Sequence, residues 1–235
     1  VRMRESIEWF ECRPLHGQTV ATTRRREQAE ELAGELMAAG AEVIEAPTIA
    51  LVPVEDHAAA DEALEGLNDY DWLVLTSTNG VDAMFERLTA VGRDSRALAG
   101  VKVAAVGRAT AARLAAHGIR ADLVPGEAVG EALADELIQH DVAGRRILLL
   151  RAEIARKVLT DALAAAGAVC VDLPVYRTVC PDKLPEEFLR LLDRDGISWI
   201  TLTSPSCWNN LLKLLGPERA AKLYNVKLAS IGPVT

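Results

Sequence analysis

Small hydroxyl residues recur where apolar, β-branched runs give way to helical spacing. The segments are LTSTNGVDAMF, AVGRATAARL, LTSPSCWNNLL and SIGPVT, and their hydroxyl residues are Thr76, Ser77, Thr110, Ser204, Ser206 and Thr235. A hydroxyl in such a place caps the first turn of a helix, where free N–H groups and the positive end of the helix dipole also attract an anion. Two interpretations stay open: simple helix caps, or a set of anion sites at the carboxyl ends of strands.

Cationic residues follow the same strands, and one tyrosine stands in an extended connector. The cations are Arg24, Arg25, Arg26, Arg108, Arg151, Arg156 and Lys157. They are interpreted either as a local basic lining for an anionic ligand or as solvated helix starts with i,i+4 partners. Tyr176 is interpreted either as a proton donor or as a packing residue of its connector.

The usual catalytic and metal-binding patterns are missing from the sequence. It contains no GxSxG, no P-loop, no HExxH and no GxGxxG after a strand. The four cysteines, Cys12, Cys170, Cys180 and Cys207, form no CxxC pair. We therefore expect reduced cysteines and no metal.

Composition and charge exclude several classes of partner. The 235 residues carry 26 Lys and Arg against 34 Asp and Glu, which gives a net charge of −8 and disfavours nucleic acid. No apolar run is as long as a membrane span, and the first fifteen residues lack the apolar core of a signal peptide. We expect a cytoplasmic protein with an aliphatic α/β core that binds neither nucleic acid nor membrane.

The chain contains the same pattern twice. Four pairs of residues are each 127 positions apart: Arg24 and Arg151, Gly40 and Gly167, Pro47 and Pro174, Trp72 and Trp199. VKVAAVGRAT at 101–110 also matches VKLASIGPVT at 226–235, at a spacing of 125. A repeat of this kind indicates an internal duplication of one strand–helix unit.

Each copy alternates apolar strands with helical spacing, which is typical of parallel sheets covered on both faces. Two β-rich connectors, 48–56 and 175–182, occupy matching places and predict a two-stranded β hinge between two lobes. The expected lobes are 18–52 with 174–235, and 53–173, and residues 1–17 are interpreted as a linker from an upstream domain. The second copy stops at Thr235, and comparison with the first copy leads us to expect about 35 further residues.

The ordered set LTSTNGVDAMFERL, VAAVGRATAARLAAHGI, LRAEIARKVLTDALAAAGAVCVDLPVYRT, ITLTSPSCWNNLL and LASIGPVT resembles uroporphyrinogen-III synthase from about residue 18 onward. The segment RESIEWFECRPLHGQTVATTR is similar to the junction in bifunctional proteins in which a uroporphyrinogen-III C-methyltransferase precedes the synthase. This resemblance implies two flavodoxin-like lobes with the active site in the cleft between them.

The resemblance also implies the reaction. The linear tetrapyrrole hydroxymethylbilane, which carries eight carboxylates, closes to a ring through a spiro intermediate with inversion of ring D and loss of water. It implies no cofactor, Tyr176 as the favoured proton donor, and Thr76, Ser77, Thr110, Ser204, Ser206 and Thr235 as residues of the substrate cleft. From their places at the strand ends, Arg24, Arg108 and Arg151 are also expected to bind the substrate, and we expect a monomer. The alternative from another class is a two-lobed, non-catalytic small-molecule sensor of a regulator.

Overall fold

The computed structural model describes residues 12–24 and 26–232 and divides the chain into two compact units. Unit 1 is Val1–Ala50 with Val179–Thr235, and unit 2 is Leu51–Thr178. The sequence places the two crossings at 52/53 and 173/174. The second crossing comes later in the structure because β7 (Val169–Val179) is one continuous strand, and its Val175 and Tyr176 pack in the core of unit 2.

Unit 2 is built on a five-stranded sheet with the order β3-β7-β6-β4-β5. Besides β7, its strands are β3 (Ala50–Val52), β4 (Trp72–Leu75), β5 (Lys102–Ala105) and β6 (Arg146–Ala152). β4 lies parallel to both β5 and β6, and β6 lies parallel to β7. Every residue of β4 is buried, as are Ile147–Leu150 of β6, because helices cover both faces of the sheet.

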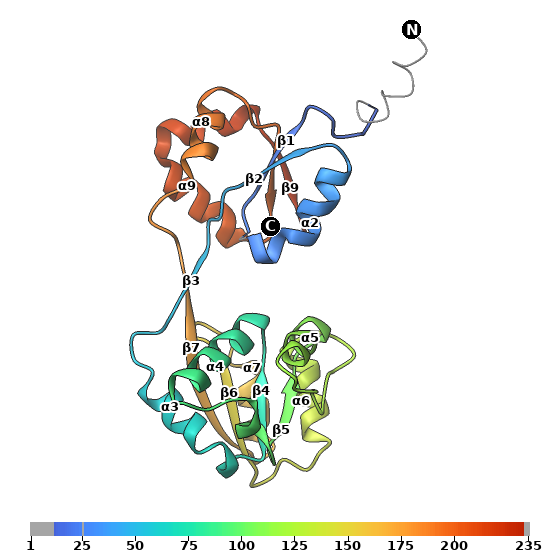
Figure 1. Ribbon diagram of the computed structural model, residues 1–235, viewed down its shortest axis with the longest axis vertical. Coiled ribbons are helices and arrows are strands. Elements are labelled where there is room, and N and C mark those ends of the chain that lie inside the picture. Colours follow the sequence, from blue (N-terminus) through green and yellow to red (C-terminus); the bar gives the residue numbers. More distant parts are fainter. Residues whose placement is uncertain (1–11, 25, 233–235) are drawn as a thin grey trace. The chain divides into compact units, whose positions relative to one another are not determined.

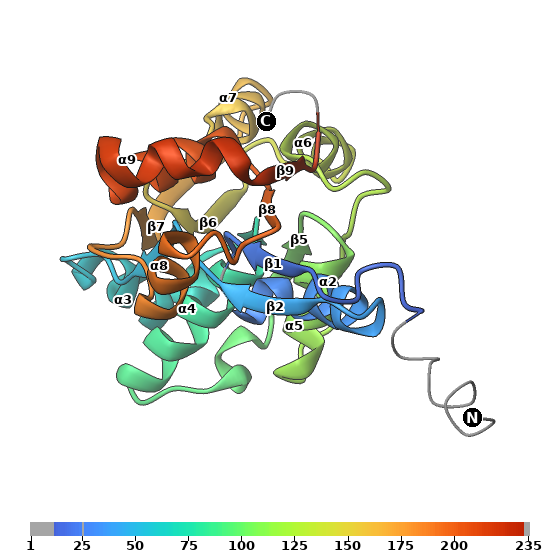
Figure 2. The ribbon, with the colours of Figure 1, turned by 90° about the horizontal axis from the view of Figure 1, so that it is seen from above.

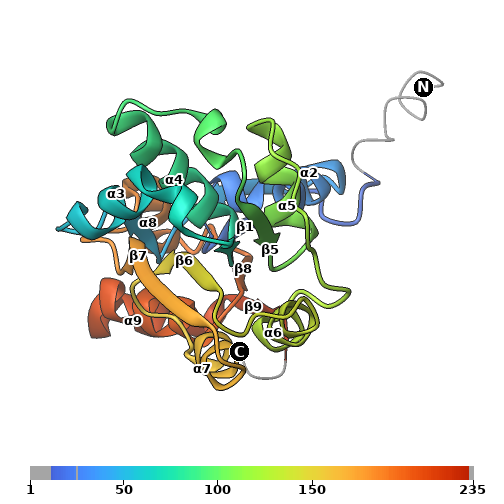
Figure 3. The same cartoon turned by 90° about the horizontal axis from the view of Figure 1, so that it is seen from below.

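Alternate residues of the central strands of unit 2 enter two separate cores. Leu73 and Leu75 pack with α3 (Ala58–Glu65), α4 (Thr78–Ala90) and α5 (Arg108–Ala116). Trp72 and Val74 pack with α6 (Gly130–Ile138) and α7 (Val158–Ala165) on the opposite face. Figure 3 shows both layers, with α3, α4 and α5 on one side of the strands and α6 and α7 on the other. Two short 3₁₀ segments, Leu67–Asp69 and Ser95–Leu98, lie in the connections.

Unit 1 has a four-stranded sheet with the order β2-β1-β8-β9. The strands are β1 (Thr19–Thr22), β2 (Glu42–Glu45), β8 (Trp199–Leu202) and β9 (Lys227–Ser230), and the pairs β1/β2, β1/β8 and β8/β9 are parallel. α8 (Glu186–Asp193) and α9 (Pro205–Ala220) share one core on one face, and α2 (Arg26–Ala38) lies on the other side of the sheet (Figure 1). A 3₁₀ segment, Ala221–Asn225, leads into β9.

The strand registers confirm the duplication. In unit 2, Trp72 pairs with Ile147 and with Lys102; in unit 1, Trp199 pairs with Val20 and with Lys227. These are the same positions of the repeat, and each lysine ammonium lies over its tryptophan ring, at 5.3 Å in unit 2 and 5.0 Å in unit 1. The two sheets are therefore built on one pattern, although β9 is exposed along its length and β5 is buried from Val103 to Ala105.

The helix ends that the sequence predicts at Gly40 and Gly167 are also confirmed. Both glycines have positive φ, 96° and 86°, directly after the last turns of α2 and α7. In this left-handed conformation a side chain is strained, so glycine is the favoured residue at both positions. Within the described residues, no helix has the length and apolar character needed to cross a bilayer.

Candidate active site

Ser77 and Tyr176 meet at the carboxyl edge of the sheet in unit 2. Ser77 follows β4 and caps α4: its Oγ accepts a hydrogen bond from Gly80 N at 3.0 Å. Tyr176 lies on β7, and its phenol oxygen is 3.0 Å from the Ser77 Oγ. Ser77 therefore caps a helix and also contacts Tyr176, which is the only tyrosine in the predicted hinge strands. The hydroxyl expected to cap a helix and the phenol considered as a proton donor thus form one hydrogen-bonded pair.

The neighbouring helix α5 begins without a side-chain cap. Its first turn follows Gly107, which provides no hydroxyl or carboxylate to accept from the helix N–H groups. A Cβ at this position would lie 2.7 Å from the Ala128 Cβ, so only glycine lets the 124–129 loop lie against the helix start. Thr110 is 3% exposed and Arg108 is exposed on the same first turn. This combination of uncapped N–H groups, a buried hydroxyl and a guanidinium suits a carboxylate.

Arg151 has a different environment from the one that the sequence suggests. Its side chain is 6% exposed and forms an ion pair with Asp172 on the adjacent strand β7. The Arg151 Nε lies 2.7 Å from the Asp172 Oδ1, Nη2 bonds the other carboxylate oxygen, and Nη1 donates to the Arg156 carbonyl at 2.8 Å. The guanidinium is therefore engaged inside unit 2, and it holds the loop that follows β6.

Unit 1 repeats the serine cap at the start of α9. Ser204, 127 residues after Ser77, accepts from Cys207 N at 3.3 Å. Its hydroxyl also donates to the Cys207 Sγ at 3.2 Å. Cys207 occupies the place that Gly80 has in unit 2. The cap serine thus has a second partner in both units, a phenol in unit 2 and a thiol in unit 1.

The Cys207 thiol is 1% exposed and lies among hydroxyl groups. Burial opposes its ionisation, but side-chain hydrogen bonds, first that of the Ser204 hydroxyl at 3.2 Å and then that of Thr203 at 3.6 Å, outweigh burial and lower the pKa of this thiol below its usual value. The sequence interpretation of Cys207 as a reduced core cysteine accounts for its burial and not for this polar surrounding.

The remaining predicted residues are spread along the same edges of the two units. Thr76 is half-buried directly before Ser77, and Ser206 is exposed in the first turn of α9. Arg24 is exposed after β1, and Lys157 is exposed at the start of α7. Arg156 is also exposed, and its Nη1 lies 3.3 Å from the Glu131 Oε1. Three predicted residues, Thr235, Arg25 and the side chain of Arg26, lie outside the part of the chain that is described.

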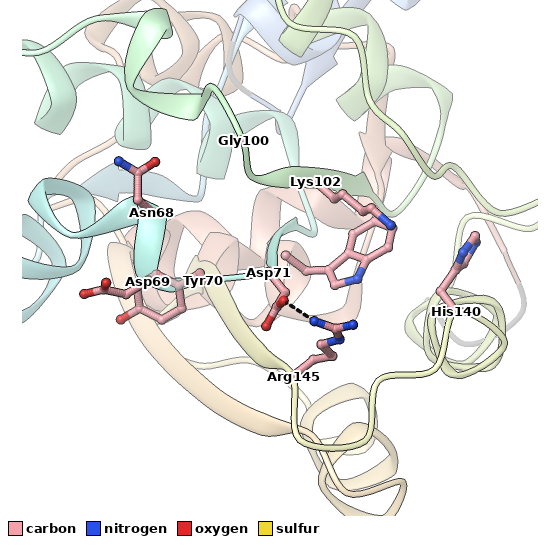
Figure 4. Close-up of a pocket in the computed structure, with 9 residues that line it drawn as sticks. Asn68, Asp69, Tyr70, Asp71, Gly100, Lys102, His140 and Arg145 are labelled. Atoms are coloured by element: carbon pink, nitrogen blue, oxygen red, sulfur yellow. Dashed lines mark hydrogen bonds and ion pairs between the residues drawn. The ribbon is translucent and has the colours of Figure 1, made fainter.

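A polar pocket of about 420 Å³ lies at the opposite, amino-terminal edge of the sheet in unit 2 (Figure 4). It is lined by Asn68, Asp69, Tyr70, Asp71, Trp72, Gly100, Lys102, His140 and Arg145. Ligands of open α/β sheets bind at the carboxyl edge, so this pocket is at the wrong edge for the usual site.

The charged side chain of Asp71 in this pocket forms bonds that stabilise the sheet. The Asp71 Oδ1 pairs with the Arg145 Nη1 at 2.9 Å, and Oδ2 accepts from Arg146 N at 2.9 Å. The backbone bond from Arg146, together with Arg145 and Lys102, lowers the pKa of the Asp71 carboxyl. Asp71 therefore fastens the start of β4 to the start of β6.

Comparison with known proteins identifies the family of this chain. Residues 30–235 match the family model described as uroporphyrinogen-III synthase HemD. The chain belongs to the uroporphyrinogen-III synthase family. Its function is accordingly that of a uroporphyrinogen-III synthase in tetrapyrrole biosynthesis, and such an enzyme is a cyclising lyase. The family decides against the alternative of a non-catalytic sensor.

Individual relatives agree with this assignment. The chain is 39% identical to the uroporphyrinogen-III synthase of Synechococcus elongatus over 94% of its own length and 85% of that protein. It is 29% identical to the porphyrin biosynthesis protein HemD of Ruminiclostridium josui, covering 87% of this chain but only 40% of that longer protein. A crystal structure of a mutant uroporphyrinogen III synthase from Thermus thermophilus shares the fold, with a TM-score of 0.57, 21% identity and coverage of 93% and 86% of the two chains.

Two features of this synthase site have no signal in the sequence. The Ser77–Tyr176 bond joins residues 99 positions apart, and no spacing rule relates them. The uncapped start of α5 depends on the contact between Gly107 and Ala128, which belongs to tertiary structure. The turn pattern identifies the helix starts, but it does not show which of them has a phenol beside it.

Proposed function

We propose that this synthase converts hydroxymethylbilane into uroporphyrinogen III with inversion of ring D, and that Tyr176, held by Ser77, protonates the departing hydroxyl. The observation that carries the proposal is the 3.0 Å contact between the Tyr176 phenol and the Ser77 Oγ at the carboxyl edge of the sheet. A phenol there can act as a general acid, and a serine already fixed as a helix cap gives that phenol one orientation.

The hydrogen-bond inventory of Ser77 supports this direction of proton transfer. Its Oγ accepts from Gly80 N, so its own O–H remains available to donate to the Tyr176 oxygen. In that arrangement the phenol proton is free to move to the substrate hydroxyl, which leaves as water. The serine O–H then stabilises the phenolate, which recovers a proton when the new ring carbon loses one during closure.

Positioning supplies the rest of the catalysis. Loss of water gives an azafulvene cation, and uncatalysed closure gives the isomer in which ring D is not inverted. The enzyme must hold the chain so that ring D attacks through its substituted carbon, which is an effect of orientation and electrostatics.

In unit 2 we assign carboxylates of the substrate to the starts of α4 and α5, with Thr76, Arg108 and Thr110 as their contacts, supported by the uncapped first turn of α5. Ser77, whose Oγ accepts from Gly80 N and lies against the phenol oxygen, acts through Tyr176. On unit 1, Ser204 and Ser206 at the start of α9 are candidate contacts for a carboxylate.

Arg151 has a structural part in this proposal. Its ion pair with Asp172 and its bond to the Arg156 carbonyl fix the loop after β6, so it acts on the site through that loop. Arg24 is exposed after β1 and remains a candidate contact for a carboxylate on unit 1.

We also propose that the protein acts in the cytoplasm as a monomer, fused to or working with a uroporphyrinogen-III C-methyltransferase. The acidic composition of the chain supports the location, and the likeness of RESIEWFECRPLHG to the junction in bifunctional proteins supports the partner. Size-exclusion chromatography with light scattering measures the oligomeric state directly.

The activity itself is tested with hydroxymethylbilane generated enzymatically in the same vessel. Oxidation of the products and isomer-resolving chromatography should show uroporphyrin III as the main product of the full-length protein. A folded protein that leaves only the type I isomer contradicts the proposal.

A further inference from the structure

Three large apolar side chains stand exposed at the carboxyl edge of unit 2, on the face covered by α6 and α7. They are Val129, Ile154 and Val158, with exposures of 40%, 88% and 44%, and we call them the α6–α7 patch. Val129 is the residue before α6, Val158 is the first residue of α7, and Ile154 lies in the loop between β6 and α7. Isolated exposed apolar residues are ordinary, whereas several at one ligand-binding edge are not.

The members of the patch are brought together by contacts between the two helix starts. A Cβ at Gly130 would lie 3.8 Å from the Leu159 Cβ, so the residues that follow Val129 and Val158 are in van der Waals range. The Arg156 Nη1 lies 3.3 Å from the Glu131 Oε1, which ties the loop of Ile154 to the first turn of α6. Figures 2 and 3 both show α6 and α7 side by side.

The patch lies at the same carboxyl edge of the sheet as the proposed active site. Glu153 N, next to Ile154, donates to the Tyr176 carbonyl at 2.9 Å. On the other side, Ala128, next to Val129, lies against the uncapped start of α5 at Gly107. Apolar side chains therefore lie at the same edge of the sheet as the main chain of Tyr176 and the start of α5, while the phenol of Tyr176 packs on the α3–α5 side.

Charges around the patch balance one another. Glu131 is paired with Arg156, and the exposed Glu153 and Lys157 have opposite signs. The patch consequently offers apolar area and no excess of positive charge, which suits a part of the ligand that is itself uncharged.

We propose that Ile154, with Val129 and Val158, packs against a pyrrole ring of the linear tetrapyrrole substrate. This inference rests on the proposed function. The carboxylates of such a substrate lie on its periphery, and its pyrrole faces are the apolar surface that a patch of this kind can cover. A ring held against Ile154, at the same edge of the sheet as Tyr176, is restricted in orientation, and orientation decides which carbon of ring D attacks.

The test is Ile154→Ser in the full-length protein. We expect the KM for hydroxymethylbilane to rise about tenfold, which corresponds to about 1.4 kcal/mol, with the midpoint of urea unfolding unchanged because the side chain is exposed. Ile154→Leu should restore the KM to within about twofold, since leucine keeps the apolar area. The matched control is Ile138→Ser, another exposed isoleucine at the far end of α6, which should leave the KM unchanged.

Three outcomes count against the inference, and they are distinguishable. If the wild-type protein forms the type III isomer and Ile154→Ser keeps the wild-type KM, the patch has no part in binding while the proposed function stands. If the wild-type protein forms only the type I isomer, the proposed function fails and this inference fails with it. An equal rise in KM for Ile138→Ser also counts against the patch, because the effect is then not local.

Discussion

The phenol oxygen of Tyr176 lies 3.0 Å from the Oγ of Ser77, and the same serine oxygen caps helix α4 through Gly80 N. One oxygen atom thus links the start of a helix to the candidate proton donor. We therefore expect the helix cap to fix the orientation of the phenol and to couple the local structure of α4 to the proposed chemistry at Tyr176, and mutation can measure this coupling.

The first prediction concerns this coupling. Ser77→Ala should lower kcat, and the double variant with Tyr176→Phe should be no slower than Tyr176→Phe alone, because the serine acts through the phenol. The substitution should also cost about 1 kcal/mol of stability through loss of the cap. Single-turnover rates and urea unfolding of the four proteins measure both effects.

Ser204→Ala is the matched control, since it removes the equivalent cap of α9 in unit 1. We expect Ser204→Ala to lose a similar amount of stability. In the double variant with Tyr176→Phe, the fold-reduction in kcat should equal the product of the two single reductions. Independent, multiplying effects of Ser77→Ala and Tyr176→Phe contradict the coupling.

The second prediction separates Arg108 from Arg151. Arg151→Gln should lower the free energy of unfolding by about 1.5–3 kcal/mol, because it removes charged hydrogen bonds to Asp172 and the Arg156 carbonyl. Arg108→Gln should leave unfolding unchanged and raise the KM, because Arg108 is exposed at the start of α5. Chemical denaturation measures the free energy of unfolding, and steady-state kinetics measure the KM. A raised KM with unchanged stability for Arg151→Gln, or lost stability with an unchanged KM for Arg108→Gln, contradicts this prediction.

The third prediction concerns Thr110. Thr110→Ala should reduce kcat/KM by less than Tyr176→Phe does, because the uncapped N–H groups at the start of α5 remain available to a carboxylate. Steady-state kinetics under identical conditions make the comparison. Complete inactivation, in protein with an unchanged melting curve, indicates that one hydroxyl carries the chemistry.

The fourth prediction follows from the lowered pKa of Asp71, which stems first from the Arg146 backbone bond and then from Arg145. A carboxyl whose pKa is lowered by folding adds stability above its unfolded pKa of about 3.9 and loses it as the pH falls through the folded value. Asp71→Asn should therefore be less stable than wild type at pH 7, and the gap should narrow below about pH 4. Urea unfolding of both proteins between about pH 3 and pH 7 tests this prediction. A difference in stability that does not change with pH contradicts a stabilising role for the bonds of the Asp71 carboxylate to Arg145 and Arg146 N.

The duplicated fold could be predicted from the sequence, because residues that repeat at a constant spacing mark equivalent strands and helices. Trp72 and Trp199, and Gly40 and Gly167, have the equivalent places that their spacing of 127 predicts. The site follows only in part. Hydroxyls at strand ends predict the caps at Ser77 and Ser204, but the same pattern suggests Arg151 as a ligand residue, and its partner Asp172 is set by the β6/β7 register.

Local sequence patterns also predict one strand that hardly forms, and they miss one candidate binding residue. The alternation of strands and helices in the first copy predicts a strand near RADLVP at 120–125, yet Leu123 forms only an isolated bridge with Ala104. The exposed Ile154 gives no signal at all, because only the fold shows that its loop lies beside Tyr176.

The central claim is that Tyr176 supplies a proton while the helix starts enforce the inversion of ring D. Its most direct test is the isomer formed by Tyr176→Phe, with enzyme in molar excess over hydroxymethylbilane so that enzymatic closure outpaces the spontaneous reaction. The account predicts closure slowed by up to about 10²–10⁴-fold for loss of a general acid, with type III still formed in the enzymatic phase. Closure at the wild-type rate, or an enzymatic product that is type I, contradicts it.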